Sequence, residues 1–412
     1  MFDVAIIGGG PAGLASAISA CEQGAKVVLI EQQNRLGGIL NQCIHNGFGL
    51  HYFGVELTGP EYAKKWEDKF NEHNTEVKLN TMVVGLKQSG LGIEINTISP
   101  KGAETIKTKT VVFAMGCRER PCGAINLCGT RPAGVFSAGQ AQKFVNIYGK
   151  MVGKDVVILG SGDIGLIMAR RLTCEGANVL GVYEIMPKSG GLARNVAQCL
   201  NDFNIPLHLS TTVVAVEGKE RVTGVWVAPV DENLTPILDK KQFIKCDTLL
   251  LSVGLIPEVE LFSNFNLETC PATGSVSVND YFQTSCPNLF ICGNVLHVND
   301  LADNVSNEGL SAGKYAALFA KNKLPKSNII EIQHSCHIKY TVPKYIHTSS
   351  ENDICTIAFR VGKEFKRAKI VATSNGKVIS QKPSPAVTAG EMQLLKINKS
   401  LINGDLKIDI EV

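Results

Sequence analysis

Short apolar runs in this chain are repeatedly followed by glycine and then by a stretch with helical character. Val4–Ile7 leads into a glycine-rich turn and an Ala/Leu/Ile-rich stretch that ends near Cys21. Lys26–Ile30 is the next apolar run, and Asp155–Leu159 and Asn178–Tyr183 repeat the alternation later. Strands that alternate with helices in this way are typical of parallel sheets covered by helices. The pattern therefore predicts an α/β fold.

From about Ile330 the pattern changes to short strands. Thr356–Val361 is apolar, and Lys369–Ser380 contains an Asn-Gly pair that suits a type I′ hairpin turn. Leu406–Val412 alternates apolar and polar residues with a period of two. We expect a small C-terminal β-rich domain over residues 330–412, a sandwich or a barrel, that either docks a partner or caps the preceding domain.

Length and composition fit a globular protein of several domains. The 412 residues correspond to two or three domains of roughly 150 residues each. With 44% hydrophobic and 19% charged residues, the chain is neither disordered nor fibrous. A net charge of +3 without a basic block excludes a nucleic-acid footprint. No apolar run approaches the ~18 residues of a membrane span, and Met1–Val4 has no basic leader.

The thirteen cysteines are scattered without paired CxxC spacing, and their number is odd. A secreted disulfide framework is therefore not expected, and reduced thiols in a cytoplasmic protein fit better.

The first glycine-rich turn has the spacing Gly-x-Gly-x-x-Gly between a strand and a helix. Gly8 permits a tight turn, Gly10 lets a pyrophosphate approach the backbone, and Gly13 lets the helix and strand pack closely. The N-terminus of the helix offers N–H groups to phosphates. Glu31 ends the next strand ~20 residues later, where a carboxylate accepts hydrogen bonds from ribose hydroxyls. The neighbouring residues expected in this dinucleotide site are Pro11, Ala12 and Gln32.

The same arrangement returns with Gly160, Gly162, Gly165 and Glu184. Two such units predict two dinucleotides and hydride exchange between them. Glu184 suits a free ribose 2′-hydroxyl and would repel a 2′-phosphate, so we expect NAD(H) rather than NADP(H) in this site. Asp163 and Ile164 are its neighbouring residues.

Three later strands, Thr110–Gly116, Thr248–Gly254 and Asn288–Asn294, end in small residues, and a glycine doublet, Gly37-Gly38, follows the first acid. With these ordered motifs, residues 1 to about 325 resemble the two-dinucleotide flavoprotein disulfide oxidoreductases. The resemblance implies two Rossmann-like domains, with FAD in the first and the NAD-binding domain inserted into it. The implied bounds are 1–148 and 259–327 for the FAD-binding domain and 149–258 for the NAD-binding domain. The resemblance adds Gly37, Gly38, Ala114, Gly116, Gly293, Asn294 and Ser306 to the FAD site and Gly254 to the NAD site.

Two of these positions need comment. The family usually has Asp where this chain has Asn294, and a neutral amide is a weaker acceptor for a ribitol hydroxyl. Ser306 is expected to cap a helix over about Ser306–Lys321, whose positive end faces the flavin in proteins of this fold.

Disulfide reductases of this fold carry a dithiol beside the flavin, and this sequence matches neither of its usual positions. Cys43 is the single cysteine after the glycine doublet, and His45 stands where the flavin-proximal sulfur is usual. Cys117 and Cys122 are able to pair but fit neither arrangement. We therefore expect an enzyme without an active-site dithiol. The catalytic candidates are Cys43, His45 and His297, although the histidines are explained equally well by loop structure.

A metal site from Cys43, His45 and His51 has poor spacing for zinc, so no metal is expected.

Finer matches point to multi-subunit enzymes. Met115–Pro121 and Ala133–Gly139 look like the NAD-linked alpha subunits of sarcosine- and opine-oxidase-type flavoenzymes. Gln42–Gly49 is similar to flavoproteins that accompany anaerobic glycerol-3-phosphate dehydrogenase subunits. The resemblance implies an electron-transfer subunit with a dehydrogenase partner. The tail has two cysteines, Cys336 and Cys355, too few for a cluster, so an iron–sulfur centre would come from another subunit.

The leading hypothesis is an FAD-dependent, NAD(H)-linked oxidoreductase that serves as an electron-transfer subunit. One alternative is a free-standing NADH oxidase or peroxidase that uses Cys43 as a single redox thiol, which requires a lowered thiol pKa. Another is a non-catalytic scaffold that binds FAD structurally. Self-association and the ultimate substrate stay open.

Overall fold

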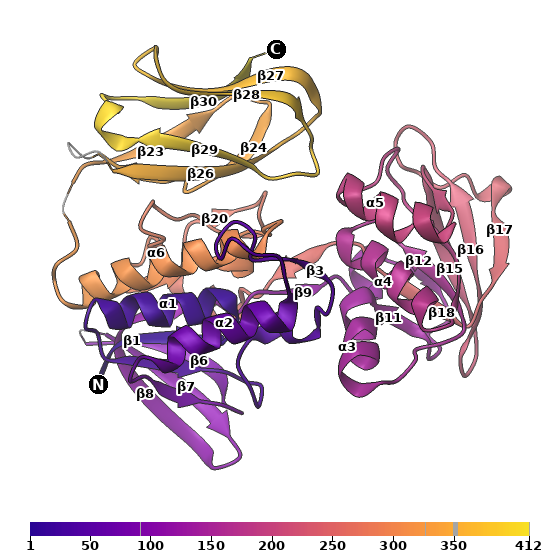
Figure 1. Cartoon of the computed structure of the whole chain (residues 1–412), viewed down its shortest axis with the longest axis horizontal. Helices are drawn as coiled ribbons and strands as arrows, with labels where there is room; N and C mark the ends of the chain where they lie inside the picture. Colours follow the sequence, from indigo (N-terminus) through magenta and orange to yellow (C-terminus); the bar gives the residue numbers. More distant parts are fainter. Residues whose placement is uncertain (91, 326, 349–352, 412) are drawn as a thin grey trace. The chain divides into compact units, whose positions relative to one another are not determined.

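The computed structural model describes residues 1–90, 92–325, 327–348 and 353–411 and divides the chain into two compact units (Figure 1). The first unit comprises Met1–Cys117 and Pro257–Val412, and the second comprises Arg118–Ile256. The second unit therefore begins at Arg118 rather than at the expected residue 149. The reason is that the strand β11 (Val135–Ser137) and the helix α3 (Ala138–Tyr148) join the sheet and the core of that unit.

The first unit is built on a seven-stranded sheet. Its strands are β1 (Phe2–Ile7), β2 (Val27–Ile30), β5 (Glu76–Lys78), β6 (Met82–Ser89), β7 (Gly92–Ser99), β8 (Gly102–Phe113) and β22 (Leu289–Ile291). β5, β2, β1 and β8 lie side by side in parallel, and β22 adds to β8 in parallel. β7 pairs antiparallel with β8 and with β6. The helices of this unit are α1 (Pro11–Glu22), α2 (Gly59–Asn71) and α6 (Ala302–Ala320).

Alternate residues of the parallel strands enter two different cores, as the strand period of two requires. Val4 and Ile6 pack with the helices α1, α2 and α6. Ala5 and Ile7 face the opposite core, which contains residues of β6 and β7 and Tyr340 from the C-terminal region. The sheet is therefore buried on both faces, which explains why β1 and β2 are almost continuously apolar.

Helices α1 and α6 lie side by side and pack closely, although they are far apart in sequence (Figure 1). A Cβ atom at Gly309 would lie 2.3 Å from the carbonyl oxygen of Ala12, and one at Gly313 would lie 2.0 Å from that of Ser16. The hydroxyl of Ser16 donates to the Gly309 carbonyl at 3.0 Å. Glycine at both positions is what lets the two helix backbones approach so closely.

The second unit contains a parallel five-stranded sheet between helices and a second sheet. The five strands, in spatial order, are β11, β18 (Thr248–Leu251), β12 (Asp155–Leu159), β13 (Asn178–Tyr183) and β14 (Leu207–His208). The helices α3, α4 (Asp163–Cys174) and α5 (Ala193–Cys199) contribute to one core beside this sheet. The other core is shared with the strands β10 (Cys128–Gly129), β15 (Thr211–Gly218), β16 (Val222–Pro229) and β17 (Gln242–Lys245).

The C-terminal region, residues 329–411, is a β-sandwich, hereafter the C-terminal sandwich. One sheet has the order β25 (Tyr345–His347), β23 (Ile329–His334), β30 (Leu406–Glu411), β27 (Phe365–Ser374) and β28 (Lys377–Val387). The other has the order β24 (Ile338–Val342), β26 (Ile354–Val361) and β29 (Gln393–Asn398). Apolar residues of both sheets form its core. The predicted hairpin is confirmed, with positive φ values of 44° at Asn375 and 78° at Gly376.

Short strands complete the structure: β3 (Asn46–Phe48), β4 (Leu57–Thr58), β9 (Cys117–Glu119), β19 (Leu255–Pro257), β20 (Thr269–Cys270) and β21 (Ser275–Val276). Together these elements confirm the expected α/β fold with Rossmann-like domains and a C-terminal β-rich region. None of the helices in the described ranges has both the length and the apolar character that a bilayer crossing needs.

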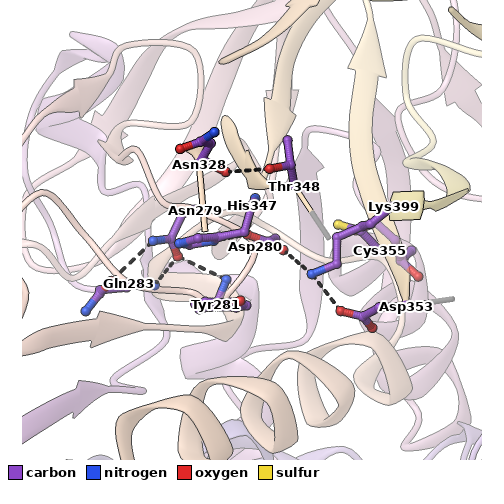
Figure 2. Close-up of polar contacts among 11 residues, drawn as sticks. Asn279, Asp280, Tyr281, Gln283, Asn328, His347, Thr348, Asp353, Cys355 and Lys399 are labelled. Carbon is purple, nitrogen blue, oxygen red and sulfur yellow. Dashed lines mark hydrogen bonds and ion pairs between the residues drawn. The ribbon is translucent and has the colours of Figure 1, made fainter. Parts of the chain in front are cut away.

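A buried ion network fastens the C-terminal sandwich to the first unit (Figure 2). Asp280 accepts from the backbone N–H of His347 at 2.9 Å, and its Oδ1 lies 2.5 Å from Nδ1 of the same residue. The Nζ of Lys399 lies 2.9 Å from Asp280 Oδ2 and 2.6 Å from Asp353 Oδ2. The rings of His347 and Tyr281 stack with centroids 3.9 Å apart. These contacts bury the charges of Asp280 and Lys399 in a network that satisfies both.

Candidate functional site

The first glycine turn, Gly8–Gly13, lies between β1 and α1. Gly8 has a φ of +106°, and a Cβ atom there would lie 2.5 Å from the carbonyl oxygen of Ala114. A Cβ atom at Gly13 would lie 1.8 Å from the carbonyl oxygen of Gly8. Both positions therefore require glycine for the tight turn and for helix packing, as the sequence predicts.

Glu31 lies at the end of β2 and holds this turn. Its Oε2 accepts from the Gly9 N–H and its Oε1 accepts from the Gln33 N–H, both at 2.7 Å, and the residue is 6% exposed. Gln32, which we expect in the same site, has an exposed side chain. The carboxylate is thus fixed beside the backbone of the turn, where the ribose of a dinucleotide would meet it.

The glycine doublet lies directly against the first glycine turn. The Gly37 N–H donates to the Gly9 carbonyl at 2.9 Å. Gly38 has a φ of +57°, and a Cβ atom there would lie 2.9 Å from the Cα atom of Gly10. Gly10 and Gly38 thus form a pair of facing backbone segments without side chains. A cradle of this kind lets a pyrophosphate or ribitol lie against the backbone, so these residues fit FAD.

The second glycine turn, Gly160–Gly165, repeats this geometry in the second unit. Gly160 has a φ of +91°, and a Cβ atom there would lie 2.2 Å from the Ser252 carbonyl oxygen. Glu184 ends β13 and is 8% exposed. Its Oε2 accepts from the Ser161 N–H at 2.8 Å, and its Oε1 accepts from the Met186 N–H at 3.0 Å. Glu184 therefore bridges its turn and the following segment as Glu31 does.

Other residues of the expected NAD site fall around this turn. Asp163 is the first residue of α4, and its Oδ1 accepts from the Leu192 N–H at 2.8 Å and from the Asn195 side chain at 2.6 Å. Ile164 follows Asp163 in α4, and Gly162 precedes the helix. Gly254 has a φ of +101° with no atom within 4 Å of a Cβ built there. The side chain of Asp163 therefore orients the 192–195 segment.

Gly293 and Asn294 follow β22 and contact residues at the start of α6. The Gly293 N–H donates to Glu308 Oε2 at 2.7 Å. Asn294 Oδ1 accepts from the Asn299 N–H at 3.0 Å. A Cβ atom at Gly293 would lie 3.0 Å from the Cβ atom of Ala12. The motif thus lies against the first glycine turn, as the resemblance implies.

The sequence analysis did not include Glu308 in the site. Its Oε1 lies 2.6 Å from Nε2 of His297, so one carboxylate joins the Gly293 backbone to that imidazole. His297 is completely buried. A Glu in the first half of a helix looks like an ordinary surface residue in the sequence, and no local signal pairs it with His297.

Three buried polar atoms of the same segment have no hydrogen-bond partner among the described residues. They are Nδ1 of His297, Oδ1 of Asn299 and Oδ1 of Asp303. Burying such atoms without a partner is unfavourable. They therefore mark the 297–303 segment as a place where a polar ligand or water would be bound.

The expectation that Ser306 caps a helix is wrong. α6 begins at Ala302 after Leu301, so Ser306 lies inside the helix. Its hydroxyl lies 2.9 Å from the Tyr62 hydroxyl of α2 and is completely buried. The helix starts one turn earlier because residues 302–305 already pack as helix against the first unit, with Asp303 and Val305 buried.

The loop after the glycine doublet contains the two other catalytic candidates. Burial raises the pKa of the Cys43 thiol to about 12. His45 is half-buried, and its ring lies 5.1 Å from the ring of Phe48. The N–H of His51 donates to Asp303 Oδ2 at 2.9 Å, which ties this loop to α6. No metal-binding group of three His, Cys, Asp or Glu side chains occurs among the described residues, and no disulfide joins the cysteines there.

Comparisons with known proteins agree with this geometry. Residues 2–309 match the family model described as pyridine nucleotide-disulphide oxidoreductase. Hydrogen cyanide synthase subunit HcnB of Pseudomonas protegens is 28% identical over 312 residues, covering 70% of this chain. A mitochondrial dihydrolipoyl dehydrogenase of Caenorhabditis elegans is 27% identical over 350 residues, covering 75% of this chain. The chain spans 65% and 66% of the lengths of these two relatives.

A solved structure shares the fold. The thioredoxin reductase of T. acidophilum superposes with a TM-score of 0.64 at 24% sequence identity. The match covers 78% of this chain and 98% of that protein. This likeness concerns the α/β fold and carries no information about the substrate.

Proposed function

Because the chain belongs to the pyridine nucleotide-disulphide oxidoreductase family, whose members bind FAD and NAD(P)H, we propose that it exchanges electrons between NADH and bound FAD. We further propose that it does so as the electron-transfer subunit of a dehydrogenase complex, and without an active-site dithiol.

The observation that carries the proposal is the repeated arrangement of the two glycine turns with their carboxylates. Glu31 and Glu184 each accept from one backbone N–H of the turn and from one backbone N–H two residues further along the chain. One chain therefore offers two preorganised places for an adenosine ribose and its pyrophosphate. A single dinucleotide would leave one of them without a purpose.

The residues around the first glycine turn would hold FAD. Gly10 and Gly38 would face its pyrophosphate and ribitol, Glu31 its ribose, and Gly293 the segment near the ribitol. When bound, the flavin supplies the redox chemistry by exchanging a hydride with a nicotinamide ring. The chain's contribution is to position the cofactor and to present the positive N-terminal end of α6 toward developing negative charge.

The second glycine turn supports NADH rather than NADPH as the nicotinamide cofactor. The buried carboxylate of Glu184 is an acceptor for ribose hydroxyls and would repel a 2′-phosphate. No arginine follows Glu184 at once to neutralise that phosphate, and Lys188 is the nearest cation in sequence.

The absence of a dithiol relay is part of the proposal. The position usual for a flavin-proximal sulfur is His45, and Cys43 is the single cysteine of that loop. The raised pKa of Cys43 also speaks against a single redox thiol, because the thiolate is the reactive form.

The role as a subunit draws on relatives and on sequence motifs. HcnB, with which the chain aligns, is itself named as a subunit of hydrogen cyanide synthase. The motifs at Met115–Pro121 and Ala133–Gly139 resemble NAD-linked alpha subunits of sarcosine- and opine-oxidase-type enzymes. We propose a partner that oxidises glycerol 3-phosphate, an amine or an imino acid, together with a separate iron–sulfur protein.

Anaerobic titration of the purified protein with NADH tests the function. We expect the protein to contain FAD, or to take it up, and its yellow absorbance to bleach upon addition of one equivalent of NADH. NADPH serves as the matched control and should act far more slowly. A protein that binds no FAD, or whose bound flavin NADH leaves oxidised, would overturn the proposal.

A further inference from the structure

The segment His297–Leu301, hereafter the 297–301 segment, lies between the Gly293–Asn294 motif and the start of α6. It is a loop without helix or strand structure. Loops of this kind keep one conformation when side chains from neighbouring elements hold them. Here the neighbours come from two regions of the first unit, the expected FAD site on one hand and the C-terminal sandwich on the other.

The C-terminal sandwich contacts this segment through Tyr340 and Arg360. These residues are directly paired on the neighbouring strands β24 and β26. The ring of Tyr340 stands edge-on to the ring of His297, with centroids 6.2 Å apart and an interplanar angle of 84°. One terminal nitrogen of Arg360 donates to the Val298 carbonyl at 3.1 Å and also pairs with the carboxylate of Asp300.

Further contacts fix both partners of that ion pair. The Met392 N–H donates to the other carboxylate oxygen of Asp300 at 2.6 Å. The second terminal nitrogen of Arg360 donates to the Gly390 carbonyl. The side chains of Arg360 and Asp300 are 18% and 22% exposed, so water competes less for this pair than for a surface pair.

Contacts with the expected FAD site hold the same segment from its other neighbour. His297 Nε2 lies 2.6 Å from Glu308 Oε1, and Glu308 Oε2 accepts from the Gly293 N–H. The Asn299 N–H donates to the Asn294 side chain. Arg360 and the Gly293–Asn294 motif are thus linked through five consecutive residues.

We propose that Arg360 is a positioning residue of the FAD site. It fixes the 297–301 segment through Val298 and Asp300, and the segment in turn fixes the motif and the start of α6. The C-terminal sandwich is therefore a working part of that site and not merely a cap. This inference rests on the proposed function, because it takes FAD to lie against Gly293 and Asn294.

The chain offers a matched control in a second anchor of the same sandwich. The Nζ of Lys344 lies 2.6 Å from Glu268, and the hydroxyl of Tyr345 donates to the same carboxylate at 3.0 Å. This anchor fastens the sandwich to the first unit without a contact to the 297–301 segment among the contacts described above. If the sandwich acted by its attachment alone, loss of either anchor would have the same effect.

FAD binding by the full-length apoprotein separates these possibilities. We expect Arg360→Gln to raise the dissociation constant of FAD at least tenfold and Lys344→Gln to change it less than twofold. Arg360→Lys should have an intermediate effect, because an ammonium lacks the planar fork of a guanidinium. Asp300→Asn, which keeps the shape of the side chain, provides a second route if Arg360→Gln fails to fold. Wild-type affinity in Arg360→Gln, or equal losses in Arg360→Gln and Lys344→Gln, would overturn the inference.

Amide hydrogen exchange of the apoprotein gives a readout that does not require FAD. Peptides that span residues 297–301 should exchange at least tenfold faster in Arg360→Gln than in the wild type and unchanged in Lys344→Gln. If the wild type binds no FAD, the proposed function fails, and the exchange rates still decide whether Arg360 positions the segment. Equal exchange in the wild type and in Arg360→Gln would overturn that positioning.

Discussion

Asp280 and Lys399 form an ion pair in which Oδ2 and Nζ lie 2.9 Å apart, and each side chain is 3% exposed (Figure 2). The first residue belongs to the segment before β22 and the second to the C-terminal sandwich. Charges buried to this degree lose most of their hydration, so the fold is stable because each has further partners. Lys399 also pairs with Asp353, and Asp280 also pairs with His347.

Lys399→Met should lower the free energy of unfolding by about 3 kcal/mol, because the substitution leaves a buried carboxylate without its cation. Urea unfolding followed by circular dichroism measures the loss. Lys407→Met is the control, since that lysine is 51% exposed and pairs with Asp409 at 3.5 Å; its effect should stay within about 0.5 kcal/mol. Equal effects of the two substitutions would contradict the importance of the buried network.

The stability of the wild type should depend on pH through Asp280. Burial alone would raise the pKa of this carboxyl, but the hydrogen bond with His347 and the charge of Lys399 outweigh it and lower the pKa. A carboxyl with a lowered pKa in the folded state stabilises the fold above its unfolded-state value of about 3.9, and this stabilisation is lost as the pH falls through the folded value. The stability difference between the wild type and Asp280→Asn should therefore shrink below about pH 4. Unfolding measured at several pH values checks this, and a difference that grows on acidification would refute it.

Glu184→Ala should lower the preference for NADH over NADPH at least about tenfold, measured as the ratio of the two kcat/KM values. The reason is that the substitution removes both the acceptor for ribose hydroxyls and the charge that repels a 2′-phosphate. Glu175→Ala, at the end of α4 in the same unit, removes a carboxylate that pairs with Arg171 and should leave the ratio unchanged. An unchanged ratio in Glu184→Ala would mean that this residue does not contact the ribose.

Gly38→Ala should weaken FAD binding about tenfold or more, because the added Cβ atom would lie 2.9 Å from the Cα atom of Gly10. Gly90→Ala is the control. Gly90 has a φ of +53°, close to the +57° of Gly38, but has open space around a Cβ atom. Both substitutions should cost about 1 kcal/mol of backbone strain, whereas FAD titration of the apoprotein should detect weaker binding in Gly38→Ala alone.

Cys43→Ser should retain NADH-driven flavin reduction within about twofold of the wild-type rate. The raised pKa of Cys43 leaves little thiolate near neutral pH, so a thiol-based step has no suitable nucleophile there. Stopped-flow absorbance of the flavin gives the rate. If turnover is abolished in Cys43→Ser, the alternative of a single-thiol NADH oxidase regains support.

Local motifs predicted the elements that depend on local chain geometry. The turns at Gly8 and Gly160 need positive φ values and close backbone approaches, and the Asn375–Gly376 turn needs two positive φ values, so glycine and asparagine mark them in the sequence. The carboxylates Glu31 and Glu184 follow from their places at the ends of strands. Each of these signals lies within a few residues or within one strand–helix–strand unit.

Contacts between distant segments were not predictable in this way. The start of α6 depends on burial against the first unit, so the expected cap at Ser306 was misplaced. The pairing of Glu308 with His297 and that of Arg360 with Asp300 join different elements. The beginning of the second unit at Arg118 depends on the pairing of β11 with β18, more than 100 residues later. Polar residues at such positions look like ordinary surface residues until the fold brings them together.

The close packing of α1 with α6 also constrains how the polypeptide acquires its structure during synthesis. The groove on α1 that receives Gly309 and Gly313 is complete long before the ribosome reaches those codons, and the entire inserted unit is translated in between. The second unit is continuous in sequence and is able to finish folding while the earlier region still waits for its last parallel strand and its long helix. Nascent chains stalled before residue 289 should therefore contain a protease-resistant insert within a protease-sensitive N-terminal region.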